Sequence, residues 1–185
     1  MKSIPLKNYP GLMNDMQFNG KNSMNIMNIK KLGKSIIIVL IIFGIAYYIS
    51  SFWFQFMLIQ GNSMEPSYKN YQLVLLDKRD SVLKQGDVIV FQCDGLKAVL
   101  VKRIIACPGD TVQIVNGTLY VNGTAFKYPD VSYEGISYAG IAQNEIHLQE
   151  NQFFVMGDNV EFSKDSRYQE VGCVSKEDIL GIVIP

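Results

Sequence analysis

The sequence predicts a mainly β fold: an antiparallel β-sheet domain preceded by one N-terminal transmembrane helix. A run of 25 residues without a charge, residues 35–59, is dense in Ile, Leu, Val and aromatic side chains. After it, short β-branched runs alternate with Asp-Gly and Asn-Gly turn signals, and no long amphipathic helical pattern interrupts them. The roughly 125 residues beyond the run are enough for one hydrophobic core.

The uncharged run is long enough to cross a membrane. A spanning helix needs about 20 apolar residues, and we assign residues 35–56 to it. Tyr47, Tyr48 and Trp53 belong to an aromatic cluster towards its end, as at a membrane interface. A removable signal peptide is the alternative, but its apolar region usually has about 7–15 residues, and no small-x-small site follows closely here. We therefore expect a permanent anchor.

The distribution of charge predicts the topology. The net charge is zero, yet six lysines and one aspartate lie before residue 35, whereas the rest of the chain carries 11 basic and 16 acidic side chains. Lys30, Lys31 and Lys34 flank the start of the apolar run, so the positive-inside rule places the N-terminus in the cytoplasm. We expect a mobile, basic cytoplasmic tail at residues 1–34 and an extracytoplasmic domain at residues 57–185, held at the plasma membrane.

The strands follow from apolar runs and the turns between them. Residues 73–76 and 88–92 are the first two predicted strands. The pair Asp94-Gly95 is typical of a two-residue hairpin turn, so residues 98–106 should return antiparallel beside residues 88–92.

Further strands follow towards the C-terminus. Two Asn-Gly pairs predict a small meander over residues 111–126. Residues 127–145 lack a period and are interpreted as a surface loop. Residues 152–156 and 180–184 read as the last strands, with a helical turn at residues 175–178 before the final one.

Ser63 is the first candidate for chemistry. It lies just beyond the apolar run, in a bent segment where Gly61 and Asn62 permit a tight turn and Pro66 fixes φ. Bent loops on rigid scaffolds often present nucleophiles. Taken alone, Ser63 is more often one loop serine among many.

Lys102 is the second candidate. On a strand it shares a face with Leu100 and Ile104, whereas Arg103 points the other way. Desolvation on an apolar face lowers the pKa of an amine, and a neutral lysine is a usable general base. The alternative is a lysine whose ammonium reaches water from a strand edge.

Residues 157–167 are the third candidate, because they place hydroxyl groups and opposite charges in a turn-rich segment. Such a segment either orients a catalytic amine or is a solvated loop. Cys93, Cys107 and Cys173 have no metal-ligand spacing, and we expect small apolar core residues. His147 is interpreted as a loop or surface residue.

Together these stretches resemble the bacterial type I signal peptidases. Residues 63–67 are similar to the family's Ser-Met-x-Pro-Thr/Ser nucleophile box, and residues 86–91 to its Gly-Asp-hydrophobic strand. Residues 102–110 resemble the Lys-Arg box that ends in Pro-Gly-Asp, and residues 157–167 resemble the last box. The boxes occur in the family's order after one N-terminal anchor, and the resemblance covers residues 35–185.

The resemblance implies a membrane-bound serine endopeptidase that removes signal peptides from exported preproteins. Ser63 would be the nucleophile, Lys102 the general base, and Ser163 a hydrogen-bond partner of the lysine. The Ser63 backbone N–H would be one oxyanion donor. Some members use a hydroxyl two residues before the nucleophile as the second donor. That position is Gly61 here, which leaves a backbone donor. Supporting ion pairs are implied for Asp158, Asp165, Arg103 and Arg167.

The resemblance also implies how a substrate is held. An extended preprotein segment would pair with strand edges, and shallow apolar pockets would accept small side chains. Met57, Ile59 and Leu100 are the candidates for the pocket walls. The lipid bilayer is the other expected partner. We expect a monomer without cofactor, metal or nucleic acid.

Two alternatives stay open from the sequence. One is a non-catalytic or dedicated relative that assists assembly of surface fibres such as pilins, although both dyad residues are present. The other is a Ser-Lys self-cleaving repressor, which would carry a soluble DNA-binding N-terminus in place of a hydrophobic span.

Overall fold

The computed structural model describes residues 12–79 and 82–184, and of residues 12–30 and Ile49 the backbone alone. The chain divides into two compact units, Met1–Ser50 and Ser51–Pro185. Residues 1–11 of the predicted tail lie outside the described residues.

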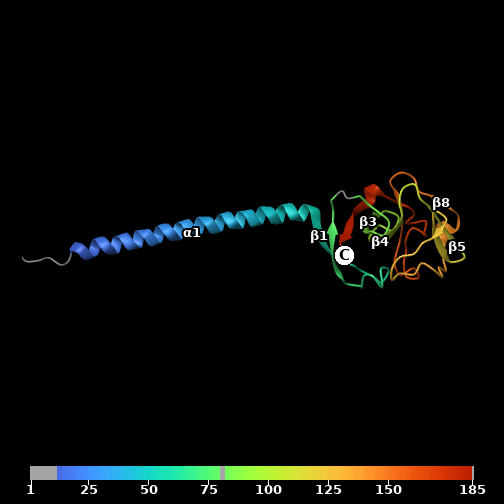
Figure 1. Ribbon diagram of the computed structural model, residues 1–185, viewed down its shortest axis with the longest axis horizontal. Helices are drawn as coiled ribbons and strands as arrows, with labels where there is room; N and C mark the ends of the chain where they lie inside the picture. The colour runs from blue at the N-terminus through green and yellow to red at the C-terminus, as the bar shows by residue number, and fades with distance from the viewer. Residues whose placement is uncertain (1–11, 80–81, 185) are drawn as a thin grey trace, which may run out of the picture. The chain divides into compact units, whose positions relative to one another are not determined.

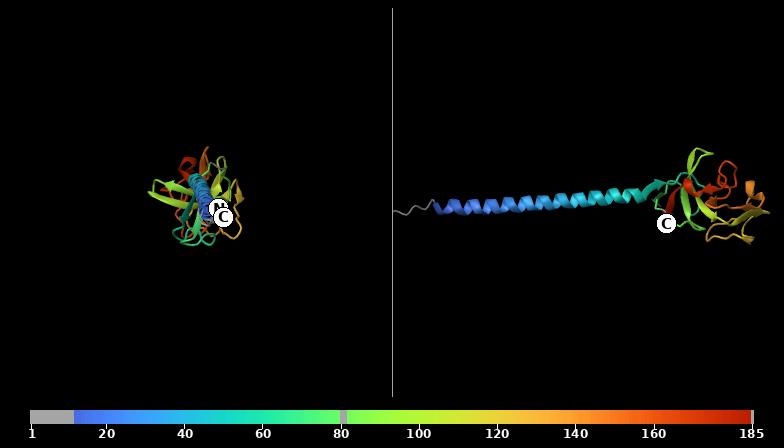
Figure 2. Two further views of the ribbon diagram at one scale, coloured as in Figure 1. Left: turned by 90° about the vertical axis from the view of Figure 1, so that its left-hand side faces the viewer. Right: turned by 90° about the horizontal axis from the view of Figure 1, so that it is seen from above.

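The first element is one long helix, α1, which spans Leu12–Trp53 without a break (Figures 1 and 2). Its segment Lys31–Trp53 is long and apolar enough to cross a membrane. The apolar side chains of that segment, such as Phe43, are exposed, as a lipid-facing helix requires. The helix starts earlier than residue 35, so residues 12–34 of the predicted tail are helical. Asn, Met and Lys are compatible with a helix, and the helical turns that contain them continue the apolar helical segment towards the N-terminus.

The helix also ends earlier than predicted. The backbone of Phe54–Leu58 forms strand β1, which pairs antiparallel with β2, Leu73–Asp77. Residues 54–56 therefore belong to the sheet. Sequence pattern could not reveal this, because an apolar run suits a buried strand and a membrane helix equally well, and the partner strand lies many residues away.

The larger sheet has seven strands, all paired antiparallel, in the order β1-β2-β11-β3-β4-β9-β10. Its remaining strands are β3 Val88–Cys93, β4 Ala98–Ala106, β9 Gln152–Met156, β10 Val174–Ser175 and β11 Ile179–Ile184. The last strand, β11, pairs with β2 and so returns to the beginning of the sheet. The predicted strands and the turn before the last one, Lys176–Asp178, are confirmed.

The predicted hairpin of β3 and β4 is confirmed, but its turn differs. Cys93 pairs with Ala98, so four residues connect the strands, and Lys97 has the positive φ of 52°. Gly95 serves another purpose, because an added Cβ would collide with the Glu170 carbonyl oxygen. Its lack of a side chain permits this close approach.

The smaller sheet has four strands in the order β7-β6-β5-β8, namely β5 Thr111–Val115, β6 Thr118–Val121, β7 Thr124–Ala125 and β8 Ile146–His147. Both Asn-Gly turns form as predicted, with positive φ at Asn116, Gly117, Asn122 and Gly123. The predicted meander is therefore confirmed.

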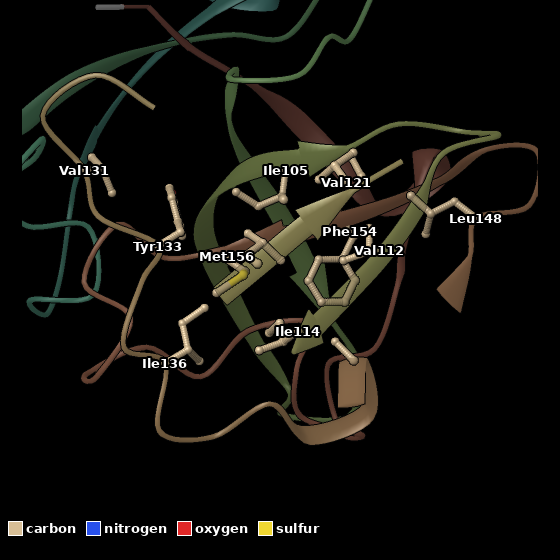
Figure 3. Packing of buried hydrophobic residues seen from close by; sticks show 13 residues of the cluster. Ile105, Val112, Ile114, Val121, Val131, Tyr133, Ile136, Leu148, Phe154 and Met156 are labelled. Atoms are coloured by element: carbon tan, nitrogen blue, oxygen red, sulfur yellow. The ribbon is translucent and has the colours of Figure 1, made fainter. Parts of the chain in front are cut away.

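One hydrophobic core lies against this smaller sheet (Figure 3). Phe154 of β9 is fully buried there among side chains of β5. Val131, Tyr133 and Ile136 also join it, so the surface loop predicted for residues 127–145 was wrong. This segment also contains the short helix η1, Gly140–Gln143. Its apolar residues are too irregularly spaced to be recognised as core residues.

The three cysteines are free thiols. Cys93 is buried, whereas Cys107 and Cys173 are half-buried and pack against the cores. The prediction of small apolar packing residues is confirmed. His147 lies on β8 with an exposed side chain 3.1 Å from Glu145.

We predict that Phe154→Ala destabilises the folded domain by about 3–5 kcal/mol, because it removes a fully buried ring from the core. Guanidinium unfolding followed by circular dichroism in detergent measures this. Val115→Ala, at a half-exposed strand end, is the control and should change stability by about 0.5 kcal/mol or less. Equal midpoints for the two variants would contradict the assigned core.

Candidate active site

Ser63 lies in a loop whose two ends are joined. The Ile59 N–H donates to the Gln72 carbonyl at 3.0 Å, and the Tyr71 N–H donates to the Ile59 carbonyl at 2.8 Å. Met64, next to Ser63, is buried and packs with Val90 and other residues of the large sheet. Ser63 therefore lies between the exposed residues Gly61 and Asn62 and the buried side chain of Met64, which holds this part of the loop against the sheet.

The carbonyl side of Ser63 is held by the segment after β9. The Asn159 N–H donates to the Ser63 carbonyl at 3.0 Å. Gly157 approaches so closely that an added Cβ would collide with the Ser63 carbonyl oxygen and with Ser163 Oγ. Glycine is required here because no other residue fits this space.

Lys102 lies in the middle of the large sheet, on β4, opposite Ile89 of β3. Only 3% of the residue is exposed. Its Nζ lies 2.8 Å from Ser63 Oγ and 3.0 Å from the Val101 carbonyl oxygen. The buried, apolar setting predicted for Lys102 is confirmed, and the alternative of an ammonium in water is wrong.

The environment of Lys102 favours the neutral amine. Burial removes hydration from the ammonium and lowers its pKa from 10.5 to about 8. The negative charges of Asp165 and Asp158 act in the opposite direction, while Arg167 adds to the lowering. Desolvation is the dominant cause, and with this pKa about a tenth of the amine is unprotonated at pH 7.

Arg103 and Asp158 form a buried ion pair. The guanidinium meets both carboxylate oxygens, at 2.7 and 2.5 Å. Arg103 also donates to the Gly86 carbonyl and to Ser67 Oγ, and it stacks at 4.0 Å on the Tyr128 ring. Through Ser67 the pair reaches the loop that carries Ser63.

Tyr133 completes this network from the segment that sequence pattern had assigned to a surface loop. Its hydroxyl donates to Asp158 Oδ1 at 3.0 Å. Burial raises its pKa, and the neighbouring Asp158 charge adds to this, so the phenol stays a donor. No sequence signal marked Tyr133, because its partner is distant in the chain.

Asp165 and Arg167 form a second buried pair at 2.8 Å. Asp165 also accepts from the Gly157 N–H at 3.1 Å, and Arg167 donates to the carbonyls of Val160 and Ser163. These contacts fix the turn of residues 157–167. The four charged residues singled out from sequence thus form two buried ion pairs, and Asp158, Asp165 and Arg167 act electrostatically on Lys102.

Ser163 does not make the predicted hydrogen bond to Lys102. Its Oγ is buried and has no hydrogen-bond partner within the described residues. The hydroxyl is packed against Gly157. The expectation of a formed bond was therefore wrong for this structure, because the lysine amine is satisfied by Ser63 and Val101 instead.

A groove of about 260 Å³ adjoins the two reactive groups. All three residues predicted for its walls, Met57, Ile59 and Leu100, line it together with Ser63 and Lys102. Sequence reasoning missed the other lining residues, which are Leu58, Gln60, Met64, Val99 and Val101. They come from β1, β4 and the Ser63 loop, so the missed strand β1 explains part of the omission.

The predicted backbone donors for an oxyanion differ from each other. The Ser63 N–H has no hydrogen-bond acceptor among the residues that the structure describes. The Gly61 N–H, by contrast, donates to Asn70 Oδ1 at 2.9 Å. The Gly61 N–H is therefore already hydrogen-bonded in this structure, which corrects its prediction as an oxyanion donor.

A serine hydroxyl thus lies against a buried amine of lowered pKa, beside a groove lined mainly by apolar residues. The family model for signal peptidase, peptidase S26, matches residues 30–184. Signal peptidase I P of Bacillus subtilis subsp. natto is 34% identical over 159 residues, which cover 80% of this chain and 83% of that protein. Signal peptidase I T of Bacillus subtilis (strain 168) is 32% identical over 159 residues, with 80% of both chains covered.

Among solved structures, a signal peptidase I from Enterococcus faecalis V583 is 28% identical, with a TM-score of 0.46, and covers 56% of this chain and 98% of its own. On the family match and the relatives in Bacillus, the chain belongs to the signal peptidase family, peptidase S26. It is a serine peptidase of the signal peptidase I type.

We predict that Gly157→Ala lowers kcat/KM by about 10- to 100-fold, because the added methyl group displaces Ser63 or Ser163. Peptide cleavage by the purified full chain in detergent measures the loss. The control Gly44→Ala adds a methyl group where no atom lies within 4 Å and should cleave normally. Full activity of the Gly157 variant would contradict the tight contact described here.

Proposed function

We propose that the protein removes N-terminal signal peptides from exported preproteins after small-x-small sites, with Ser63 as the nucleophile and Lys102 as the general base. The observation that carries this proposal is the 2.8 Å distance between Lys102 Nζ and Ser63 Oγ, at an amine whose pKa is lowered to about 8. A nucleophile within hydrogen-bond reach of a base of near-neutral pKa fits the requirements of acyl transfer.

The reaction proceeds in two halves. The neutral Lys102 amine accepts the Ser63 hydroxyl proton while Oγ attacks the scissile carbonyl carbon. The resulting ammonium gives this proton to the leaving amine, the C–N bond breaks, and the mature protein departs. An ester then joins Ser63 to the carboxyl end of the signal peptide. Lys102 next accepts a proton from water, whose oxygen attacks the ester, and proton return to Ser63 Oγ releases the signal peptide.

The other site residues support these steps without reacting. The Ser63 N–H, which has no acceptor among the described residues, is the first donor to the oxyanion. The Arg103–Asp158 and Arg167–Asp165 pairs hold the two loops in place.

The groove beside Ser63 suits an extended peptide with small side chains. Its walls are mainly aliphatic, with Met57, Ile59 and Leu100 among them. A groove of about 260 Å³ gives little room for large residues near the cut, which favours small side chains one and three residues before it. Strand edges beside the groove supply backbone groups for the extended segment.

We further propose that a membrane anchor holds the peptidase domain at the surface where signal peptides leave the bilayer. The Lys31–Trp53 segment is apolar enough to span, and Lys31 and Lys34 at its start favour a cytoplasmic N-terminus. The peptidase domain then lies on the extracytoplasmic face of the plasma membrane. A non-catalytic role in fibre assembly has no observation in its favour, because it would not require a desolvated lysine against a serine.

We predict that Ser63→Ala and Lys102→Met each abolish preprotein cleavage while the domain stays folded. Each removes one group of the 2.8 Å contact, and dyad members act as a unit. Cleavage of a labelled preprotein in liposomes is the assay, with circular dichroism as the test of folding. Lys97→Met, at the exposed hairpin turn, is the control and should process normally. Undiminished processing by either dyad variant would overturn the mechanism.

We also predict an alkaline pH profile. Because the pKa of Lys102 is lowered to about 8, its reactive neutral form increases as pH rises through that value, and kcat/KM should rise about tenfold between pH 7 and 9. Rates with a short peptide substrate across pH 6–10 measure this. A flat profile over the same range would count against a lysine base.

A further inference from the structure

The two sides of Ser63 are held in different ways. Its carbonyl side is enclosed, because Asn159 donates to the Ser63 carbonyl and Gly157 packs directly against it. Its amino side follows an exposed turn at Gly61 and Asn62. Any motion that misplaces the nucleophile therefore starts most easily on the amino side.

Packing does not restrain the Gly61 turn. The residue has a φ of 91°, which side chains rarely adopt, and no atom lies within 4 Å of the position that a Cβ would occupy. Within the turn, the Glu65 N–H donates to the Asn62 carbonyl at 3.2 Å. Gly61 itself is held by a further hydrogen bond, in which its N–H donates to Asn70 Oδ1 at 2.9 Å. This bond crosses from the first limb of the Ser63 loop to the second.

Asn70 is itself fixed in the second limb. The next residue, Tyr71, has a φ of 61°, and its N–H donates to the Ile59 carbonyl at 2.8 Å. On the other side of Asn70, the Lys69 N–H donates to Gln72 Oε1 at 2.9 Å, and the Gln72 N–H donates to the Lys69 carbonyl at 3.0 Å. The Asn70 side chain thus belongs to a tight turn where the two ends of the Ser63 loop are hydrogen-bonded to each other, and this turn positions its amide oxygen.

We infer that Asn70 is a positioning residue for the Ser63 nucleophile, acting through the Gly61 backbone. This inference rests on the proposed Ser63 and Lys102 mechanism. By accepting a hydrogen bond from the Gly61 N–H, Asn70 orients the backbone of the two residues that precede Ser63. It also takes that N–H out of use for the oxyanion, which leaves the Ser63 N–H as the backbone donor of this turn.

The size of the effect follows from the demands of catalysis. Attack requires Ser63 Oγ to approach both Lys102 Nζ and the scissile carbonyl, and a misplacement of about 1 Å can cost up to about 100-fold in rate. The other restraints on Ser63 remain when Asn70 is shortened, namely the Asn159 bond and the buried Met64. We therefore expect a smaller loss, of about tenfold.

The test compares Asn70→Ala with Asn70→Asp in the full chain in detergent. Asn70→Ala removes the acceptor and should lower kcat about tenfold, with KM unchanged within about twofold. Asn70→Asp keeps an acceptor oxygen and should recover most of the loss. The apparent pKa of the rate profile should stay near that of the unmodified protein in both, because Lys102 is untouched. Asn144→Ala, an exposed residue outside the loop, is the control.

Each other outcome overturns the inference. An unchanged kcat in Asn70→Ala would show that the bond is not needed, and a raised kcat would show that the released Gly61 N–H serves the oxyanion instead. A change in KM alone would make Asn70 a substrate contact. Equal losses in both variants would indicate a general effect on the loop. Ser63→Ala, run in parallel, separates these results from failure of the dyad, because full activity in that variant would overturn the mechanism itself.

Discussion

The site depends on the desolvation of one amine. Lys102 lies on a central strand of the large sheet, with only 3% of its surface exposed. Among the residues that the structure describes, its Nζ has two hydrogen-bond partners, Ser63 Oγ and the Val101 carbonyl oxygen. A lysine in water would be protonated and useless as a base at neutral pH. In the proposed mechanism burial makes this amine reactive, so the sheet that buries Lys102 takes part in catalysis.

The buried carboxylates are compatible with this neutral amine because each has its own cation. Asp158 is paired with Arg103, and Asp165 with Arg167. Unpaired carboxylates so near would hold the lysine in its charged form, but here they raise its pKa less than burial lowers it. The same pairs anchor the Ser63 loop and the turn after β9. Electrostatic balance and loop geometry are therefore provided by the same side chains.

Sequence predicted the features that local chemistry determines. Asn-Gly turns and β-branched runs marked the small meander, and Lys102 was recognisable as a charge on an apolar strand face. Features that depend on distant partners were missed. β1 is a strand because β2 pairs with it, Tyr133 matters because Asp158 accepts from it, and Gly61 is occupied because Asn70 reaches across the loop. None of these partners is visible from a residue's own neighbourhood in the chain.

In the proposed mechanism Lys102 is a partly neutral amine in the resting protein. Its pKa is measured directly by carbon-detected NMR of the full chain in detergent, labelled at the lysine ε-carbons, with Lys102→Met used to assign the signal. One lysine should titrate near pH 8, and that signal should be missing from the variant. Titration of every lysine near the ordinary value of about 10.4 would show that Lys102 is fully charged at neutral pH and contradict its role as the base.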